Sequence, residues 1–238
     1  MVIALIGYGR MGHEIESMAK ERGHVAGLII DQENTKDLNT SNLRDIDVAF
    51  EFTSPSSAFG NIITCLENRV PVVTGSTGWL EKYDEAVEAC DRNDTAFIHA
   101  SNFSIGVNLF FMLNEELAKQ MDRYQRYNVS IEEIHHVMKL DAPSGTAISL
   151  ANAITARHSG YEGWSPVEDS STGKIHVKSV REGSVPGTHI VQWDSEIDSI
   201  TLTHEAKNRK GFAFGAVLAA EFIYNRKGVF TMKDVMGF

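Results

Sequence analysis

The sequence predicts an α/β protein made of two domains. Three observations support this. Over the first hundred residues, apolar strand-like runs alternate with helical patterns, which is typical of a parallel sheet covered on both faces. Beyond residue 102 several strand-like runs follow one another without helices between them, which indicates a mixed or antiparallel sheet. The length of 238 residues is enough for one or two domains.

The first domain is predicted from a regular alternation of strands and helices. A β-branched apolar run at 2–6 is followed by apolar residues at helical spacing over 11–22 and by a second apolar run at 25–30. This order of strand, helix and strand is a βαβ unit. The alternation continues with strands expected at 47–52, 70–74 and 95–99, and with helices expected at 56–68 and 80–92.

The second domain is predicted to be α+β. A long apolar helix is expected at 105–120, a strand at 127–135, and a helix at 143–157 with Pro143 in its first turn. After a polar loop at 162–173, three strands are expected at 175–181, 189–193 and 199–204. An apolar helix at 212–224 would pack back on the first domain. The predicted domains are therefore 1–102 with 209–238, and 103–208.

Composition excludes several classes of protein. The net charge of −10 disfavours nucleic-acid binding, which needs clustered Lys and Arg. No apolar run approaches the ~20 residues that cross a membrane, and residues 1–12 lack the basic start of a signal peptide. Cys65 and Cys90 form no CxxC motif, so reduced thiols and a cytoplasmic location are expected, although a disulfide between them stays open.

A glycine-rich turn joins the first strand to the first helix. Gly7, Gly9 and Gly12 match the GxGxxG pattern, in which the glycines allow a tight turn, close approach of a pyrophosphate and close packing of helix on strand. The helix start would favour the anion, and Arg10 could face the phosphates. This context predicts a Rossmann-type dinucleotide-binding domain. The alternative is a glycine turn without a ligand.

The residues after the second strand bear on the choice of cofactor. Asp31 lies where a carboxylate accepts hydrogen bonds from the adenosine ribose, and it would repel a 2′-phosphate. Gln32 and Glu33 offer no guanidinium for such a phosphate, and only Lys36 could reach it. We therefore expect NADH to be preferred over NADPH. Two later polar turns, at 74–78 and 100–103, also follow strands, where a cofactor should lie.

The stretch from 135 to 146 concentrates groups that could hold and protonate a small anion. His135 and Lys139 share strand parity and could face one site, while His136 faces the other way. Ser144, Gly145 and Thr146 would present backbone N–H groups at a helix start, which suits a carboxylate. A plain helix start is the alternative. The histidines show no metal-ligand spacing, so no metal is expected, and the pair at 132–133 points to opposite faces and makes a poor acid–base dyad.

These motifs together resemble the 4-hydroxy-tetrahydrodipicolinate reductases (dihydrodipicolinate reductases) of bacterial lysine biosynthesis. The resemblance spans nearly the whole chain through GYGRMG at 7–12, EFTSP at 51–55, GSTG at 75–78, SNFSIGVN at 101–108, HHVMKLDAPSGTA at 135–147 and THEAKNRKGFAFGAV at 203–217. It implies NAD(P)H-dependent reduction of a small cyclic dicarboxylate, a homotetramer joined through the second domain, and hinge closure near Asn102 and Arg209.

The resemblance also implies roles for individual residues. His135 would be the proton donor and Lys139 the second catalytic group. The substrate contacts would be His136, Ser144, Gly145, Thr146 and Thr77. The cofactor contacts would be Gly7, Gly9, Arg10, Met11, Gly12, Asp31, Gly75, Ser76, Thr77, Ala100, Ser101, Asn102 and Phe103.

One departure and two rival functions remain. Many members of the family carry Arg-His where this chain has Val137 and Met138, which removes a cation and an imidazole near the site. The first rival is another two-domain dehydrogenase, of which an aspartate-semialdehyde type would need a catalytic cysteine; Cys65 and Cys90 lie outside the motifs. The second is a non-catalytic NADH-binding sensor, which would have no need of a proton donor.

Overall fold

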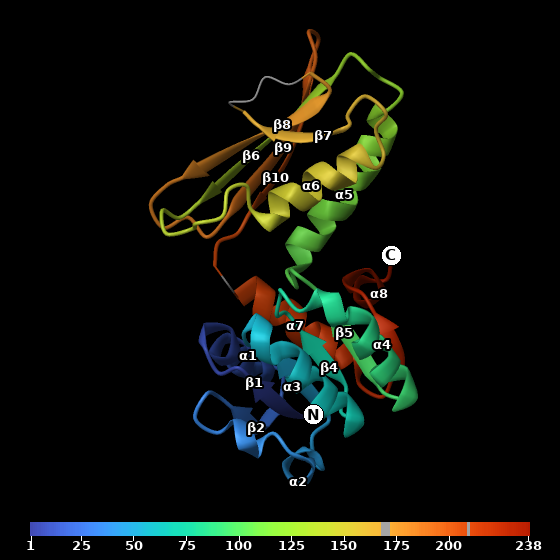
Figure 1. Ribbon diagram of the computed structural model, residues 1–238. Helices are drawn as coiled ribbons and strands as arrows, with labels where there is room; N and C mark the ends of the chain where they lie inside the picture. Colours follow the sequence, from blue (N-terminus) through green and yellow to red (C-terminus); the bar gives the residue numbers. More distant parts are fainter. Residues whose placement is uncertain (168–171, 209) are drawn as a thin grey trace. The chain divides into compact units, whose positions relative to one another are not determined.

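The computed structural model describes residues 1–167, 172–208 and 210–238, and these form two compact units (Figure 1). One unit is Met1–Ile105 with Arg209–Phe238, and the other is Gly106–Asn208. The first crossing between the units therefore lies three residues after the position expected from the sequence. Among the described residues, no helix combines the length and apolar character that crossing a membrane requires.

The first unit is built on a six-stranded sheet whose paired strands are all parallel, in the order β11-β5-β4-β3-β1-β2. Parallel strands with helical crossovers read as continuous apolar runs because both faces of the sheet are covered. The strands are β1 (Val2–Ile6), β2 (Val25–Ile30), β3 (Val48–Glu51), β4 (Val72–Thr74), β5 (Ala96–His99) and β11 (Gly228–Phe230).

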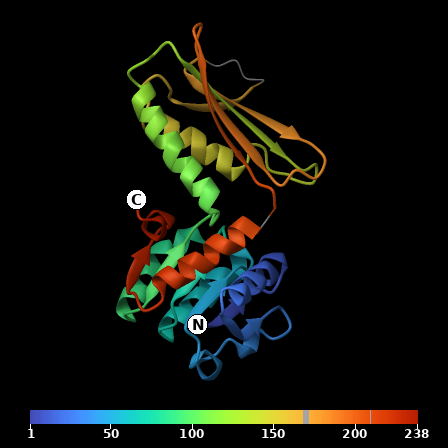
Figure 2. The same cartoon turned by 180° about the vertical axis from the view of Figure 1, so that it is seen from behind.

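Helices cover both faces of this sheet and form a separate apolar core on each. One core contains side chains of α1 (Arg10–Glu21), α7 (Lys210–Ile223) and α8 (Met232–Met236), and Figure 2 shows α7 crossing that face. The other contains side chains of α2 (Thr40–Leu43), α3 (Pro55–Glu67) and α4 (Tyr83–Arg92). The short 3₁₀ helices Thr35–Asp37 and Leu80–Lys82 lie in the connections. The predicted return of the last long helix to the first domain is confirmed.

The contact of α7 with the chain before α5 depends on a glycine. A Cβ built on Gly215 would overlap the backbone carbonyl oxygen of Phe103, and neither backbone is free to move aside. Gly60, in α3, is the opposite case, since a Cβ built there meets no atom within 4 Å.

We expect Gly215→Ala to destabilise the protein by about 1–3 kcal/mol, the usual cost of overpacking a core. Gly60→Ala should instead be neutral or stabilise by up to ~1 kcal/mol, because alanine favours a helix over glycine. Chemical denaturation of both variants measures the two free energies of unfolding. An unchanged Gly215→Ala protein would show that this packing is loose.

The second unit contains a five-stranded mixed sheet in the order β10-β9-β6-β8-β7, with parallel pairs β6–β8 and β7–β8 and antiparallel pairs β6–β9 and β9–β10. Helices α5 and α6 lie on one face of it and share its core (Figures 1 and 2). The elements are α5 (Ile105–Met121), β6 (Asn128–His135), α6 (Gly145–Thr155), β7 (Gly163–Pro166), β8 (Lys174–Arg181), β9 (Thr188–Asp194) and β10 (Ser199–Glu205).

Strand β6 alternates between exposed and buried positions, and this places charged groups inside. Val129, Ile131, Glu133 and His135 are all buried, and Val129 and Ile131 belong to the core beneath α5 and α6. Since successive side chains of a strand point to opposite faces, Glu133 and His135 lie on the same buried face. Glu132 faces the other way and pairs with Lys178.

Several short elements differ from the sequence-based expectation. The loop predicted at 162–173 contains β7, an edge strand that ends at Pro166, where proline is tolerated; residues 168–171 of that loop lie outside the described part of the chain. Strand β11 and helix α8 are short and lack a run of buried residues, so the sequence did not indicate them. Helix α6 begins at Gly145, with Ser144 as its N-cap, so the prediction that Pro143 lies in the first helical turn is wrong by two residues.

Candidate active site

A cavity of about 800 Å³ lies in the first unit, at the carboxyl ends of β1, β2 and β3. This is where ligands bind in open α/β sheets. Its lining residues come from the glycine turn, from the turn after β2 and from the start of α3: Ile6, Gly7, Tyr8, Gly9, Ile30, Asp31, Gln32, Glu33, Thr35, Phe52, Thr53, Ser54, Ser57 and Asn61. The residues from Phe52 to Asn61 are additions to the predicted site; their signal in the sequence is that they follow a buried strand.

The glycine turn has the geometry that a pyrophosphate loop requires. Gly7 has φ of +97°, a conformation that side chains rarely adopt, and a Cβ there would overlap the carbonyl oxygen of Phe52. A Cβ on Gly12 would come within 2.5 Å of the carbonyl oxygen of Gly7, so this glycine allows close packing of α1. A Cβ on Gly9 meets no protein atom within 4 Å. Gly9 therefore borders open space at the start of α1, where a phosphate fits.

The neighbours of Gly9 in the fingerprint have different surroundings. Arg10 is exposed at the first position of α1, whereas Met11 packs against the apolar core. At the other side of the cavity, Asp31 accepts a hydrogen bond from the N–H of Glu33 at 2.8 Å. Glu33 lines the cavity as well, but Lys36 is not among the lining residues. The environment for a ribose is thus acidic.

The two later polar turns follow β4 and β5, next to β3 in the sheet. The first is joined to the turn after β3, because Ser76 Oγ accepts the N–H of Thr53 at 2.8 Å. In the second turn, the side chain of Asn102 accepts the N–H of Ser104, and the ring of Phe103 is buried 5.9 Å from that of Phe52. The predicted residues not yet described differ in exposure: Ser101 and Thr77 are exposed, and Ala100 and Gly75 are partly buried.

The second unit brings the predicted catalytic residues to one end of β6. His135 is the last residue of β6 and is 7% exposed, while Lys139 lies in the following turn with its Nζ 2.8 Å from both carboxylate oxygens of Asp141. His136 is partly buried, and its N–H donates to the carbonyl of Val185. Burial lowers the pKa of His135; the charge of Glu133 opposes this shift, and the charge of Lys139 adds to it.

The start of α6 lies next to this turn in sequence. Ser144 caps the helix by accepting the N–H of Ala147 at 3.2 Å, but its own N–H donates to Glu133 at 3.0 Å. Gly145 and Thr146 form the first turn, whose N–H groups have no intrahelical carbonyl to bond. The helix start thus presents the N–H groups of Gly145 and Thr146, the arrangement on which the predicted carboxylate site depends.

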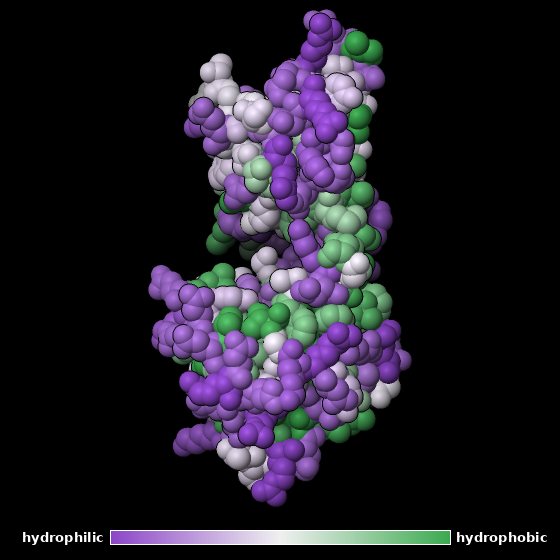
Figure 3. Space-filling view, turned by 90° about the vertical axis from the view of Figure 1, so that its right-hand side faces the viewer, coloured by the Kyte–Doolittle hydropathy of each residue, from purple (hydrophilic) through white to green (hydrophobic). Residues whose placement is uncertain are grey.

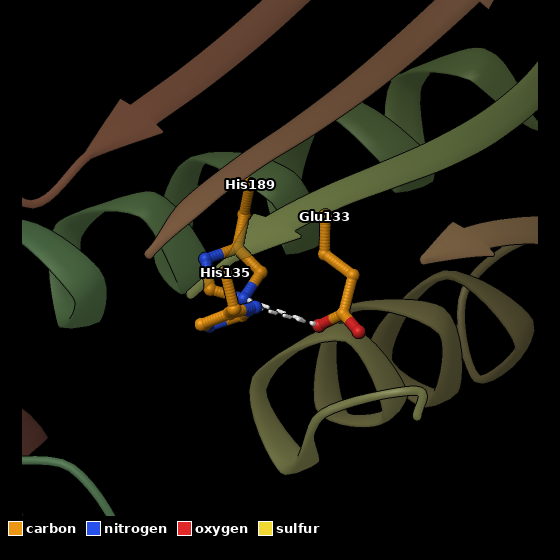
Figure 4. Close-up of side chains that lie close together, drawn as sticks. All are labelled: Glu133, His135 and His189. Atoms are coloured by element: carbon orange, nitrogen blue, oxygen red, sulfur yellow. Dashed lines mark ion pairs between the residues drawn. The ribbon is translucent and has the colours of Figure 1, made fainter. Parts of the chain in front are cut away.

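Three residues absent from the predicted site surround His135. Glu133 is fully buried and accepts hydrogen bonds from Ser144 and from Arg181 Nη2, the latter at 3.1 Å. His189, on β9, places its ring 5.1 Å from that of His135 at 73°. Figure 4 shows both rings beside one oxygen of the Glu133 carboxylate. Their signal in the sequence was weak, since residues 133 and 189 meet only through the pairing of β6 with β9.

Burial and hydrogen bonding leave Glu133 charged and His189 neutral near pH 7. Burial opposes ionisation of Glu133, but contacts with Ser144 and Arg181 outweigh it and hold its pKa below the usual range. Burial lowers the pKa of His189 to about 4, so this ring is neutral near pH 7. Glu133, His135 and His189 offer atoms within 4.8 Å of one another, as a metal would need. However, Arg181 and Ser144 already occupy the carboxylate, so we interpret the group as an ion-pair cluster.

Both cysteines are free thiols buried in the first unit. Burial raises the pKa of Cys65 to about 12 and that of Cys90 to about 11, which leaves essentially no thiolate at neutral pH. A thiolate is needed for nucleophilic attack on an aldehyde. The structure therefore argues against the aspartate-semialdehyde type of dehydrogenase.

The first unit is of Rossmann type and has a cavity beside its GxGxxG turn. The second is an α+β unit in which His135 and Lys139 lie near a helix start. These features define the class of the protein as an NAD(P)-dependent oxidoreductase for a small anionic substrate. Two family models match the chain: "Dihydrodipicolinate reductase, N-terminus" over residues 1–103 and "Dihydrodipicolinate reductase, C-terminus" over residues 106–236. The chain belongs to the dihydrodipicolinate reductase family.

Individual relatives agree with this membership. The chain is 50% identical to the 4-hydroxy-tetrahydrodipicolinate reductase of Christiangramia forsetii over 238 residues, with 99% of this chain and 98% of that protein covered. It is 32% identical to the enzyme of the same name from Alkaliphilus metalliredigens, with coverage of 96% and 95%. The solved structure of a dipicolinate-bound dihydrodipicolinate reductase from Paenisporosarcina sp. TG-14 superposes with a TM-score of 0.81 at 25% identity, covering 97% of each chain.

The membership confirms the family, fold class and enzyme class expected from the sequence. The chain is an NAD(P)H-dependent oxidoreductase, a 4-hydroxy-tetrahydrodipicolinate reductase of lysine and diaminopimelate biosynthesis. The rival reading as a non-catalytic sensor is thereby set aside.

Proposed function

We propose that this reductase uses NADH in preference to NADPH, and that His135 and Lys139 are its catalytic residues. The observation that carries the proposal is the pair of sites in one chain: a glycine-lined cavity bordered by Asp31 and Glu33, and a buried imidazole next to an ammonium and a helix start. When the cofactor is bound, its reduced nicotinamide would supply the hydride, and the protein supplies orientation and charge.

The cofactor contacts follow from the cavity. The N–H groups at the start of α1 and the open space beside Gly9 suit the pyrophosphate. Asp31 accepts hydrogen bonds from the ribose hydroxyls. We assign the nicotinamide side to the two turns that follow β4 and β5: Gly75, Ser76 and Thr77, and Ala100, Ser101, Asn102 and Phe103.

The substrate contacts follow from charge. One carboxylate of the cyclic dicarboxylate binds between Lys139 Nζ and the N–H groups of Gly145 and Thr146, since both favour an anion. Asp141, which pairs with Lys139, then shares that ammonium with the substrate. We also assign substrate contacts to His136 and to Ser144, which acts through its cap of α6, and to Thr77 on the first unit.

The protein's part in the reaction is to deliver a proton. The 4-hydroxyl group of the substrate leaves with a proton of a neighbouring ring carbon as water, which gives a conjugated ring that accepts hydride. His135 hands a proton to the ring as hydride arrives, and Lys139 stabilises the charge on the bound carboxylate. Positioned proton transfer of this kind is worth ~10²–10⁴-fold in rate.

The activity is tested by following the oxidation of NADH spectroscopically with freshly made 4-hydroxy-tetrahydrodipicolinate. We expect turnover with this substrate, and competitive inhibition by pyridine-2,6-dicarboxylate, a planar dianion with its two carboxylates at the same ring positions. Binding of NADH without turnover would contradict the assignment.

The cofactor preference is tested with Asp31→Ser. Because the variant removes the carboxylate that would repel a 2′-phosphate, the ratio of kcat/KM for NADH to that for NADPH should fall roughly tenfold, which corresponds to ~1.4 kcal/mol of repulsion. Asp37→Ser removes the same charge from a residue that does not line the cavity, and it should leave the ratio unchanged. If the ratio of kcat/KM for NADH to that for NADPH were the same in wild type and Asp31→Ser, the cofactor preference would not come from Asp31.

We further propose a homotetramer joined through the sheet of the second unit, and closure of the two domains at hinges near Asn102 and Arg209. Asn102 holds the turn before α5 through its bond to Ser104, and Arg209 lies outside the described residues. Light scattering on a sizing column should give four times the mass of the chain; a monomer would contradict the first of these proposals.

A further inference from the structure

Glu133 is a buried charge next to the proposed proton donor. Its side chain is fully inaccessible, on the same face of β6 as His135. It accepts the N–H of Ser144 and a guanidinium N–H of Arg181, contacts that favour the carboxylate over the carboxylic acid. A buried anion held in this way has a fixed position and a fixed charge.

The imidazole of His135 turns one nitrogen toward this anion. Its Nδ1 lies 3.5 Å from Oε2 of Glu133, an ion-pair distance, and Nδ1 is buried without a hydrogen-bond partner in the described part of the chain. The Nε2 side faces Gly187, where a Cβ would come within 3.0 Å of that nitrogen. Glycine at this position thus leaves room beside Nε2.

The second imidazole does not compete for the proton. His189 Nε2 lies 3.8 Å from the same carboxylate oxygen and 3.2 Å from Ser144 Oγ. Two imidazoles in contact titrate as a coupled pair, and burial, to which the charge of His135 adds, lowers the pKa of His189. Since the pKa of His189 is lowered to about 4, the proton that the cluster takes up resides on His135.

We propose that Glu133 is a positioning residue that acts through His135: it holds a proton on Nδ1 and so makes Nε2 the atom that delivers a proton to the substrate. The proposal rests on the proposed role of His135. In the step, the Nε2–H bond of the imidazolium breaks and a C–H bond of the ring forms, while NAD(P)H supplies the hydride. The imidazole that remains is neutral, with its one proton on Nδ1 facing Glu133.

Other charges around His135 act in both directions. Lys139 in the following turn and Arg181 on β8 disfavour the imidazolium, Asp141 favours it, and burial disfavours it most. Glu133 is the carboxylate nearest to the ring that is fully buried, so its effect is the least screened by solvent.

The test is Glu133→Gln, which keeps the shape and removes the charge. A general acid works only when protonated, so kcat falls as pH rises through its pKa. Without the Glu133 charge, the pH at which kcat begins to fall should be lower. At a fixed pH within the range where kcat is falling, kcat should therefore drop about tenfold, which is the smallest effect expected for a charge at this distance. Glu133→Asp keeps the charge, so its kcat should fall at a pH between those of Glu133→Gln and wild type.

Glu132→Gln is the matched control, because it removes the neighbouring carboxylate from the opposite face of the same strand, where it pairs with Lys178. Its pH profile should equal that of wild type. NMR titration of the His135 ring in each protein measures the proton affinity without any turnover, and the thermal unfolding midpoint reports the fold.

The outcomes separate the two proposals. If His135 titrates at the same pH in wild type and in folded Glu133→Gln, the role of Glu133 is overturned. If His135 titrates at lower pH in Glu133→Gln while the pH profile of kcat is unchanged, Glu133 controls the proton affinity of His135 but His135 is not the proton donor. The proposed catalytic role of His135 is then wrong. A shift in both supports both.

Discussion

Replacing Lys139 with alanine is expected to lower kcat/KM for 4-hydroxy-tetrahydrodipicolinate by about 10²–10⁴-fold. The ammonium is the cation nearest in sequence to the α6 start, and its side chain is 21% exposed, so it is partly shielded from water. Removing it takes away both a substrate carboxylate partner and the stabilisation of charge during hydride arrival. Steady-state kinetics with varied substrate measure the loss.

Lys178→Ala is the control for this variant. Lys178 carries the same charge on the same unit but pairs with Glu132 on the sheet, and its side chain is 55% exposed. It should keep wild-type kinetics. NADH binding, measured by fluorescence, should be unchanged in both variants, since neither residue lines the cavity of the first unit. A wild-type rate in Lys139→Ala would remove this residue from the mechanism.

Replacing Gly9 with valine should raise the Kd for NADH by about 10²-fold or more. The added side chain enters the space that we assign to the pyrophosphate, so two or more charge-assisted hydrogen bonds are lost, each worth about 1.5–3 kcal/mol. The protein should still fold, because a Cβ on Gly9 meets nothing within 4 Å and its φ of −87° suits any residue. Fluorescence titration with NADH gives the Kd.

Gly60→Val is the matched control for Gly9→Val. Gly60 also borders open space, on α3, but it does not line the cavity. It should bind NADH like wild type and keep its helix stability, because valine is a better helix former than glycine. Unaltered NADH binding by a folded Gly9→Val protein would mean that the cavity is not the cofactor site.

Much of the fold was predictable because each long element carries its own pattern. Strand β2 and helix α1 were predicted correctly from apolar spacing, and the alternation of strands and helices predicted the parallel sheet of the first domain. The short elements β7, β11 and α8 were not predicted because they lack the run of buried apolar residues that marks the equally short β3, β4 and β5. The two strands form by pairing with strands already in the sheets: β11 pairs with β5, and β7 pairs with β8.

The exposed apolar residues also could not be identified from the sequence pattern. Hydrophilic side chains prevail on the face shown in Figure 3, with apolar ones in patches between them. Yet Val137, Met138 and Leu140 are exposed in the turn after β6, where a helix or strand pattern would bury them. Composition describes a surface on average, whereas the chain path decides which apolar residues reach it.

The sequence by itself determined the family, the order of the elements and the contiguous motifs, because a glycine turn or a histidine–lysine run keeps its chemistry within a few residues. Only the tertiary structure decided which distant groups meet. It placed Glu133 at a core position of β6, brought His189 beside it across the β6–β9 pair, and tied Arg181 to the same carboxylate. The physical reason is that burial and charge pairing depend on through-space distance, and strands far apart in sequence become neighbours only through the register of the sheet.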